Sequence, residues 1–308
     1  GGHGCPRCKL LQTASGPSKA ELDLAMEIFG LGYKKLFSQL PVQHLGREFL
    51  FDIVALEAGI AVEYNGLYFH NQKFIKDSGH HLRRSKAAEA NELRLVHIFE
   101  DDWRNRKPVV QHFLKYLLAE MPSIMARKTS VTDVDHATAR SFYEQYHMQG
   151  PSIQSGQLHY GLEHQGELVA CMSFTAHGSG RKVLHEGHWE LVRFASKLRI
   201  QGGASKLFTA FIRQHSPKSV LSFSWSHLFS GGMYERLGFK LDKILPPDYT
   251  YVDRTKCRRL HKSGFQHSKL KTKFGENYDP TLSERLNCEA NGFYRIYDCG
   301  KKRWLWTP

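Results

Sequence analysis

Three carboxylates in the first third of the chain have a spacing that suits a metal ion. Asp52 lies in the apolar run 49–56 and Glu63 in the next apolar run, 60–64. If these runs are antiparallel strands, both carboxylates come to one end of a sheet, where Glu21 on a preceding helix can join them. Convergent carboxylates are ligands for Mg²⁺, and Mg²⁺ orients water and neutralises the phosphate in phosphodiester cleavage.

His70 and His81 can supply the proton transfers of such a reaction. His70 follows Glu63 after an Asn-Gly turn, and His81 opens a helix expected over residues 81–92. Histidine changes charge near neutral pH, so either residue can act as general base or as acid for the leaving group. Taken singly, each of these residues is more often an edge carboxylate or a packed ring. Their combination with a basic chain favours a nuclease.

A small α/β domain would hold these residues in place. Ser18 and Glu21 have the spacing of a capping box, so a helix is expected to begin at Ser18. Apolar patterns of helix and strand then alternate, which indicates a mixed α/β fold. The expected elements are strands at 49–56, 60–64 and 95–99 and helices at 81–92 and 109–118, in a domain spanning residues 17–122.

The run from Asp52 to Glu63-Tyr-Asn-Gly-Leu-Tyr-Phe-His70 resembles the active-site strands of the PD-(D/E)xK nuclease superfamily. Within it, the similarity is to the very-short-patch mismatch repair endonucleases and to phage homing endonucleases, and it covers about residues 17–120. The resemblance implies a Mg²⁺-dependent DNA endonuclease. The implied roles are metal ligands for Asp52 and Glu63, assistance from Glu21, and proton transfer by His70 and His81.

Asn65 departs from the resemblance. The superfamily pattern has lysine there and the mismatch endonucleases have histidine, so stabilisation of developing charge passes to His70, His81 or Arg84. Arg84 is also expected to contact DNA. The acidic run Glu100-Asp-Asp102 is interpreted as a solvated turn and not as a second metal cluster.

The N-terminal segment, residues 1–16, contains a fragment of a zinc module. His3, Cys5 and Cys8 have the spacing of a zinc knuckle, in which proline shapes the turn between the thiolates. Similar Cys-Pro-x-Cys units precede the nuclease in phage homing enzymes. A structural Zn²⁺ is therefore expected, with a fourth ligand that the spacing does not identify.

Residues 123–308 form a second predicted domain. The segment Arg199-Ile-Gln-Gly202-Gly-Ala204 follows a strand and opens a helix, where backbone N–H groups can face a pyrophosphate. It resembles the acetyl-coenzyme A loop of GNAT acyltransferases, and Gly232–Phe239 is similar to their later tyrosine-to-Gly-Phe segment. The resemblance covers about residues 128–245 and implies a GNAT-like mixed sheet. If acyl-CoA binds, it binds at Arg199, Gly202 and Ala204.

The GNAT-like domain is predicted to recognise DNA. No acid/base pair stands out near the loop, where Glu190 and Tyr234 are candidates, so acetyl-CoA is not expected as a cofactor. The last fifty residues are basic and aromatic without clear periodicity, and such groups track phosphates and stack on bases. The expected DNA contacts there are Arg254, Lys256, Arg258, Arg259, Lys262, Lys269 and Lys271, with Lys273 and the rings Tyr249, Tyr251, Phe265 and Phe274 among them.

Composition agrees with a nucleic-acid-binding protein. The formal net charge is +13, with hydrophobic residues at 41% and charged residues at 24%, values that suit a folded protein with a polyanionic partner. No apolar run reaches the roughly 18 residues of a membrane span, and the scattered cysteines indicate a reducing compartment. The prediction is a metal-dependent endonuclease of the phage homing type that binds double-stranded DNA in the cytoplasm, the bacterial host's if phage-encoded. The alternatives are a GNAT-type DNA base-modifying acyltransferase and a catalytically dead DNA-binding protein.

Overall fold

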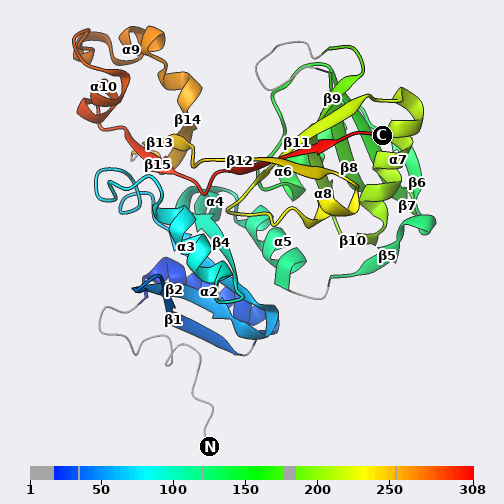
Figure 1. Ribbon diagram of the computed structural model, residues 1–308, viewed down its shortest axis with the longest axis horizontal. Helices are drawn as coiled ribbons and strands as arrows, with labels where there is room; N and C mark the ends of the chain where they lie inside the picture. Colours follow the sequence, from blue (N-terminus) through cyan, green and yellow to red (C-terminus); the bar gives the residue numbers. More distant parts are fainter. Residues whose placement is uncertain (1–16, 34, 119–120, 177–184, 254) are drawn as a thin grey trace, which may run out of the picture. The chain divides into compact units, whose positions relative to one another are not determined.

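The computed structural model describes residues 17–33, 35–118, 121–176, 185–253 and 255–308, whose elements form two compact units (Figure 1). The first unit contains the described residues up to Lys107 together with those of Ser226–Leu228 and Pro246–Gly300. The second contains Pro108–Trp225, Phe229–Leu245 and Lys301–Pro308. Each unit is therefore built from segments that are far apart in the sequence. No described helix is long and apolar enough to cross a membrane.

The first unit opens with helix α2 (Lys19–Gly30). The hydroxyl of Ser18 accepts the N–H of Glu21 at 3.2 Å, and its oxygen lies 2.8 Å from the Glu21 carboxylate. This confirms Ser18 as the N-cap, which gives one backbone N–H of the first helical turn a partner, whereas the Glu21 carboxylate contacts the Ser18 hydroxyl.

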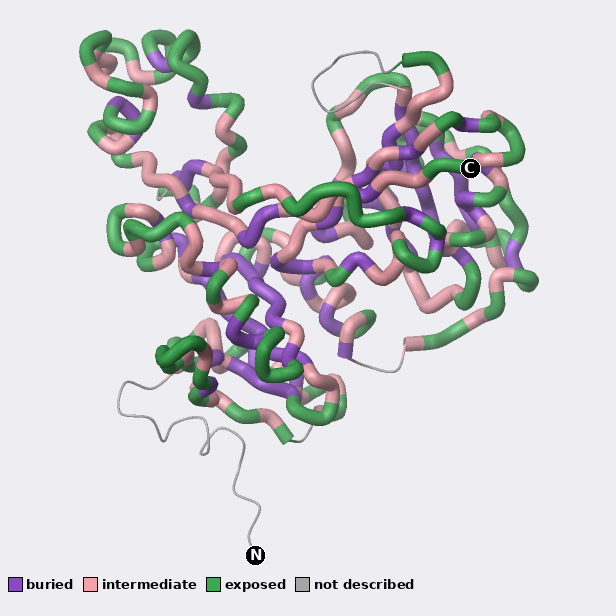
Figure 2. Tube along the Cα trace, viewed as in Figure 1, coloured by how far each residue is buried: buried purple, intermediate pink, exposed green. Residues whose placement is uncertain are grey.

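A mixed four-stranded sheet, in the order β1–β2–β3–β4, follows α2. β1, β2 and β3 are antiparallel, whereas β4 is parallel to β3 because helix α3 returns the chain to the same edge. All six residues of β3 are buried (Figure 2), as expected for a strand with neighbours on both sides. The strands predicted for this domain are present, and β1 is an additional one. The elements are β1 (Leu36–His44), β2 (Arg47–Ala55), η1 (Leu56–Ala58), β3 (Ile60–Asn65), α3 (His80–Glu89), β4 (Arg94–Phe99) and α4 (Glu100–Asn105).

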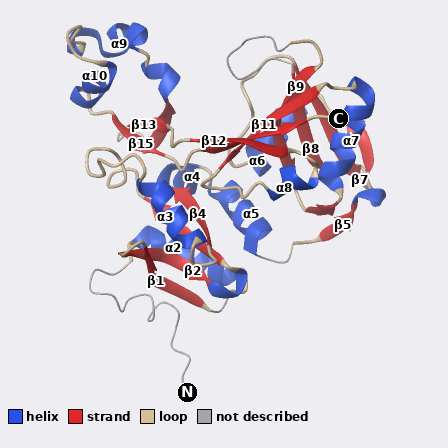
Figure 3. Ribbon diagram, viewed as in Figure 1, coloured by secondary structure: helices blue, strands red, loops and turns tan. Residues whose placement is uncertain are grey.

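The basic, aromatic segment near the C-terminus also folds (Figure 3). It contains a three-stranded antiparallel sheet in the order β14–β13–β15 and two short helices. Tyr251 and Phe265 are buried in its core with Leu270 and Cys288, so these rings pack inside the protein. The regular structure forms here although the sequence shows no clear periodicity. Its elements are β13 (Tyr249–Asp253), β14 (Arg258–His261), η3 (Lys262–Phe265), α9 (His267–Phe274), η4 (Gly275–Asn277), α10 (Glu284–Ala290) and β15 (Tyr294–Tyr297).

The three-stranded sheet belongs to the first unit and not to the second. Val252 and Ile296 share a buried cluster with Leu67 and Phe99, which follow and end strands of the four-stranded sheet. The units therefore differ from the predicted division after residue 122, which assigned the whole remainder of the chain to one domain. Contacts between segments distant in the sequence determine which residues belong to each unit. The composition of a linker does not reveal such contacts.

The second unit is built on a seven-stranded sheet in the order β12–β16–β11–β9–β8–β7–β6. Successive residues of β8 face opposite sides: Cys171 packs with α6, whereas Ala170 and Met172 belong to the cluster that includes α7. Helices thus cover both faces of the sheet. The elements are α5 (Lys107–Leu118), β5 (Ser123–Met125), η2 (Ala126–Lys128), β6 (Ser130–Asp133), α6 (His136–Tyr146), β7 (Gln157–His164), β8 (Glu167–Thr175), β9 (His188–Ser196), β10 (Arg199–Gln201), α7 (Gly203–His215), β11 (Ser219–Trp225), α8 (Gly232–Arg236), β12 (Lys240–Leu245) and β16 (Lys301–Trp306).

The last strand, β16, lies inside this sheet, antiparallel to both β11 and β12. Although β15 and β16 are neighbours in the sequence, they do not pair with each other as a hairpin. β15 pairs with β13 in the first unit, and β16 pairs in the second. Trp304 is buried between neighbouring strands, in agreement with a packing role for this ring.

Candidate active site

The parallel strands β9 and β11 pair with each other over only part of their length. Their register runs from His188 opposite Ser219 to Leu191 opposite Ser222, whereas β9 continues to Ser196. After Leu191 and Ser222, the described residues of β9 and β11 no longer pair with each other. β9 continues along β8, and β11 continues along β16. We call this place the β9–β11 fork. In open α/β sheets, ligands commonly bind outside the carboxyl ends of parallel strands, and the fork lies toward those ends of β9 and β11.

A bulge in β9 brings two charged side chains to the same face of the sheet beside the fork. The β8–β9 register shifts opposite Ser173 and Phe174, which leaves Val192 as an extra residue. Residues three apart point to opposite faces of a regular strand, but one extra residue reverses that relation. Glu190 and Arg193 therefore both lie on the face that α6 covers. Arg193 was not among the predicted site residues, although it is a second charge in an otherwise apolar run.

Tyr234 reaches the fork from α8. Its hydroxyl lies 3.0 Å from Ser222 Oγ and donates to the carbonyl of Phe223 at 3.4 Å. Ser222 Oγ in turn donates to the carbonyl of Leu191 at 2.7 Å. Since Ser222 and Leu191 are the last paired residues of β11 and β9, the phenol lies where the two strands separate.

Burial favours a protonated phenol at the fork. It raises the pKa of Tyr234; the hydrogen bond with Ser222 and the charge of Arg193 oppose this, and the Glu190 carboxylate adds to the rise. Gln154 Nε2 lies 3.3 Å from Glu190 Oε1, and Arg193 Nε donates to the carbonyl of Gly150 at 2.9 Å, so both charged groups are held in position. The Glu190 carboxylate is close enough to influence the Tyr234 phenol electrostatically, and the two groups are candidates for a base and an acid.

The segment after β9 ends in two glycines that open helix α7. Gly202 has φ 78°, a left-handed conformation that glycine adopts without strain. A Cβ on Gly203 would lie 2.8 Å from Cβ of Ile200, so this position also requires glycine. No side chain of the described residues caps α7. Its N-terminus therefore presents backbone N–H groups and the positive end of the helix dipole.

The other two residues of the predicted coenzyme loop have structural partners. Arg199 donates to the carbonyl of Tyr116 at 2.7 Å, and its guanidinium lies 5.5 Å from the centre of that ring. Ala204 packs against the main core of the second unit. Of the predicted set, Gly202 is the one that shapes the helix N-terminus.

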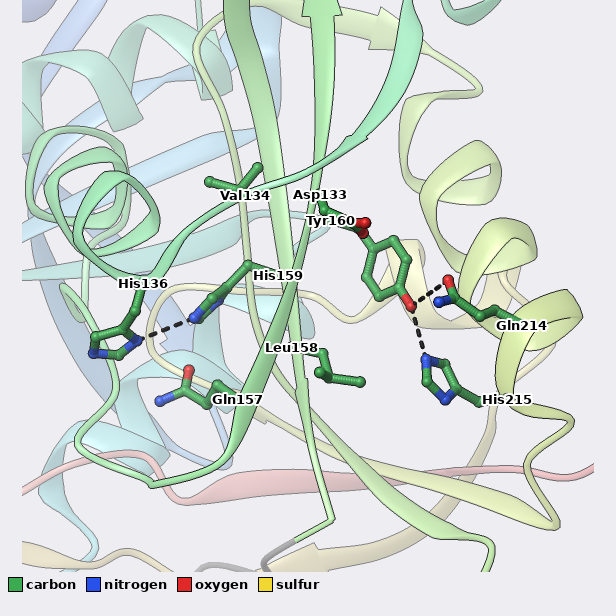
Figure 4. Close-up of a pocket in the computed structure, with 9 residues that line it drawn as sticks. All are labelled: Asp133, Val134, His136, Gln157, Leu158, His159, Tyr160, Gln214 and His215. Atoms are coloured by element: carbon green, nitrogen blue, oxygen red, sulfur yellow. Dashed lines mark hydrogen bonds between the residues drawn. The ribbon is translucent and has the colours of Figure 1, made fainter.

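A hollow of about 290 Å³ lies elsewhere on the same sheet (Figure 4). The hydroxyl of Tyr160 is 2.8 Å from Gln214 Oε1 and 2.8 Å from His215 Nε2, and His136 Nδ1 is 3.1 Å from His159 Nε2. These polar groups satisfy one another. Because β8 separates β7 from β9 in the sheet, we assign this hollow no part in the chemistry of the fork.

No protein-family model and no curated protein matches the sequence, whereas several solved structures match the fold. The ribosomal-protein-S18-alanine N-acetyltransferase from Escherichia coli has 11% identity and a TM-score of 0.34, over 58% of this chain and 93% of that one. An acetyltransferase from Bacillus subtilis in complex with CoA has 14% identity and a TM-score of 0.35, over 59% and 99%. A GNAT family acetyltransferase from Elizabethkingia anophelis with acetyl-CoA bound has 13% and 0.34, over 59% and 99%. At these values the likeness describes a GNAT-like fold in part of the chain and carries nothing about its substrates.

These matches correct the predicted enzyme class. The matched structures are described as acetyltransferases, so the prediction of a magnesium-dependent DNA endonuclease of the phage homing type is wrong. Of the predicted fold, the GNAT-like part is supported, and the PD-(D/E)xK core and the zinc module are not. Two of the matched structures are described as holding CoA or acetyl-CoA, a coenzyme that was not expected here.

Two of the carboxylates predicted to bind Mg²⁺ share a hydrogen-bond donor in the first unit. Gln39 Nε2 donates to Glu21 Oε2 at 3.4 Å and to Asp52 Oδ1 at 3.3 Å. The other oxygen of Asp52 accepts the N–H of Tyr64 at 2.9 Å. The structure therefore brings together carboxylates from a helix and a strand.

The third carboxylate, Glu63, is buried and forms an ion pair with Arg84. Arg84, which was expected to contact DNA, is thus used inside the first unit. The negative charge of Glu63 is balanced by this guanidinium. The role of Asp52 and Glu63 as metal ligands stays a prediction.

Asp52→Asn is expected to stabilise the protein increasingly as pH rises. Burial raises the pKa of Asp52 to about 8, and the charges of Glu63 and Glu21 add to this. The folded state therefore holds this proton more tightly than the unfolded state, and the stability it contributes is lost as pH rises through about 8. We expect the gain in melting temperature of Asp52→Asn over wild type to be several degrees larger at pH 9 than at pH 5, measured by circular dichroism. Glu48→Gln, at an exposed position on the same strand, is the control, and an equal gain at both pH values contradicts the prediction.

The two histidines proposed for proton transfer lie side by side. Nδ1 of His70 is 3.3 Å from Nε2 of His81, and their rings are stacked with centroids 5.5 Å apart. Burial lowers the pKa of His70 to about 4 and the pKa of His81 well below its usual value, and His80 lowers both further. Both imidazoles are therefore neutral at pH 7, which does not suit the role of a cationic acid.

The residues expected to contact DNA differ in their exposure. Arg259 is held by two carboxylates, with 2.8 Å to Asp101 and 2.6 Å to Asp102, so the acidic turn predicted to be solvated is in fact its partner. Lys262 pairs with Asp248 at 2.6 Å. Four of the predicted contacts are exposed: Lys256, Arg258, Lys269 and Lys271. The predicted contact Arg254 and the predicted zinc ligands His3, Cys5 and Cys8 lie outside the described residues.

Proposed function

We propose that the second unit transfers an acyl group from acyl-coenzyme A to an amine at the β9–β11 fork. The observation that carries this proposal is that Tyr234 lies where two parallel strands separate, close enough to Glu190 and Arg193 on β9 for their charges to act on its hydroxyl. An acid/base pair at a buried strand separation has no structural task that apolar residues would not perform better.

The residues present suit a coenzyme A ester. The uncapped N-terminus of α7, bounded by Gly202 and Gly203, suits the pyrophosphate, because its N–H groups and helix dipole favour an anion. The facing edges of β9 and β11 can hydrogen-bond an extended chain of amides, as a strand edge binds a peptide. Bound there, acyl-CoA supplies an activated thioester, whose acyl carbon forms a bond to the acceptor nitrogen while its bond to sulfur breaks.

The side chains at the fork then have defined tasks. Glu190 accepts the proton that the acceptor amine loses, and Tyr234 donates its phenolic proton to the departing sulfur. Arg193 lies close enough to influence Tyr234 and stabilises negative charge on Glu190. The phenol is suited to the acid role because burial keeps it protonated at neutral pH.

For the acceptor we propose amino groups of the bases of double-stranded DNA. The support is the net charge of +13 and the exposure of Lys256, Arg258, Lys269 and Lys271. Lysine and arginine bind DNA by neutralising phosphates and releasing counterions. An amine of a protein or small molecule is the competing acceptor class. An acyl-transfer assay with DNA, a peptide amine and a polyamine distinguishes the two classes.

Gly203→Ala is expected to weaken acetyl-CoA binding by about tenfold or more, a loss of about 1.4 kcal/mol. Its new Cβ would meet Ile200 at 2.8 Å and 2.9 Å, so the start of α7 must move away from the position that suits the pyrophosphate. Isothermal titration calorimetry of the full chain with acetyl-CoA measures the effect. Gly264→Ala, where nothing lies within 4 Å, is the matched control. If wild type does not bind acetyl-CoA, the proposed function fails.

A further inference from the structure

Three histidines of the first unit converge at a place that acyl transfer does not use. His70 follows β3, and His80 and His81 begin α3. One ring nitrogen of each lies within 4.8 Å of the others. The sequence places them ten and eleven residues apart, and the fold brings them together because the loop after β3 returns to the start of α3.

Two of the three nitrogens already have the spacing of ligands on one metal ion. His70 Nδ1 and His81 Nε2 are 3.3 Å apart. Zinc–nitrogen bonds of about 2.05 Å in a tetrahedral site place neighbouring ligand nitrogens about 3.3 Å apart. His80 is partly exposed at the start of its helix, so its ring can turn to complete a third bond.

The tautomer of His81 is fixed by a backbone carbonyl. Its Nδ1 lies 2.7 Å from the oxygen of Tyr297. A carbonyl oxygen only accepts hydrogen bonds, so Nδ1 carries the hydrogen, and Nε2 presents its lone pair to His70. Metal-binding histidines commonly donate their second N–H to a carbonyl in this way, which orients the ring.

We propose that His70, His80 and His81 bind a divalent transition-metal ion of the zinc class, with a fourth position open to solvent. Three imidazoles without a carboxylate favour Zn²⁺, Co²⁺ or Ni²⁺ over Mg²⁺, which prefers oxygen. The positive charge of the nearby Arg84 would repel a metal cation, but its ion pair with Glu63 reduces this repulsion. This site does not depend on the proposed acyl transfer.

The test uses the full chain with Cys5→Ser and Cys8→Ser, which removes the thiolates of the predicted zinc knuckle. Calorimetry is expected to give one bound Zn²⁺ per chain and no binding of Mg²⁺ at the same concentrations. Co²⁺ is expected to give visible d–d bands without a thiolate charge-transfer band. Free Zn²⁺ at a concentration of 100 times its dissociation constant is expected to raise the melting temperature of the protein by about 5 °C.

His80→Ala and His70→Asn are each expected to weaken Zn²⁺ binding by about 100-fold or more, with unchanged circular dichroism spectra. His80 is partly exposed and at a helix start, so its replacement leaves the fold intact. His267→Ala, an exposed histidine of α9, is the matched control and is expected to bind as before. If both site variants keep the affinity and the Co²⁺ spectrum, the histidines form only a hydrogen-bonded pair and the proposal is overturned.

Discussion

Tyr234→Phe is expected to lower kcat for acyl transfer by about 100-fold to 1,000-fold, the range in which a general acid contributes. The substitution removes only the hydroxyl, so the ring still packs against Trp304, with which it is stacked at 5.4 Å. Acetyl-CoA affinity is expected to stay within about twofold, since the proton is needed only when sulfur departs. Release of the coenzyme thiol is measured with duplex DNA, a peptide amine or a polyamine as acceptor.

Tyr160→Phe is the matched control, because it also removes a hydrogen-bonded hydroxyl from the core of the second unit. It is expected to retain wild-type kcat. Equal activity of Tyr234→Phe and wild type would remove Tyr234 from the mechanism. Transfer to the peptide amine or the polyamine but not to DNA would keep the acyltransferase and reject the proposed acceptor.

The pH dependence of kcat follows from the same site. Burial raises the pKa of Tyr234 above its ordinary value, so the phenol stays protonated through the neutral and moderately alkaline range. Deprotonation of Tyr234 therefore causes no loss of activity below about pH 10, the ordinary pKa of a tyrosine. Any fall of kcat on the acidic side reports a base, and Glu190→Gln is expected to abolish that fall together with most of the activity.

Arg259→Ala is expected to destabilise the protein by about 3 kcal/mol, the lower end of the range for removing one partner of a buried ion pair, because the three side chains are part-buried. Arg259 donates to Asp101 and Asp102, and its guanidinium lies 4.1 Å from the centre of the Phe99 ring. Its loss would leave two part-buried carboxylates without a cation. Urea unfolding followed by tryptophan fluorescence measures the change.

The neighbouring Arg258 is the control for this experiment. Its side chain is 49% exposed, against 16% for Arg259, and its nearest carboxylate is 3.8 Å away. Arg258→Ala is expected to change stability by less than about 1 kcal/mol. Burial already raises the pKa of Asp102, and loss of Arg259 raises it further. The defect should therefore shrink as pH falls and the carboxyl gains its proton. Equal destabilisation by the two variants contradicts this account.

Patterns within short segments predicted much of the secondary structure correctly. The N-cap at Ser18 and the apolar runs of β2, β3 and β4 are local features, because a capping residue and an apolar run can each be recognised within a few neighbouring residues. The start of α7 at a glycine pair is local in the same sense. The resemblance of the first domain to nucleases extended such local patterns to an enzyme class, and that extension failed.

Contacts between distant segments were not accessible to this reasoning. One example is β16, which could pair with β15 in a hairpin but pairs with strands of the second unit. Another is Arg259, which could contact DNA but contacts Asp101. Each outcome depends on free energies summed over residues far apart in the chain. A charged residue has the same sequence signature in either case, since only its surroundings determine whether it is solvated or paired.

The sequence alone determined the element types, the glycine opening of α7, the candidates Glu190 and Tyr234 and the basic character of the chain. The tertiary structure decided which of these residues meet. A single bulge at Val192 puts Glu190 and Arg193 on one face, and the end of β9–β11 pairing admits the phenol of Tyr234. The physical reason is that side-chain direction in a strand depends on pairing with its neighbours, and strand pairing is a property of the folded sheet.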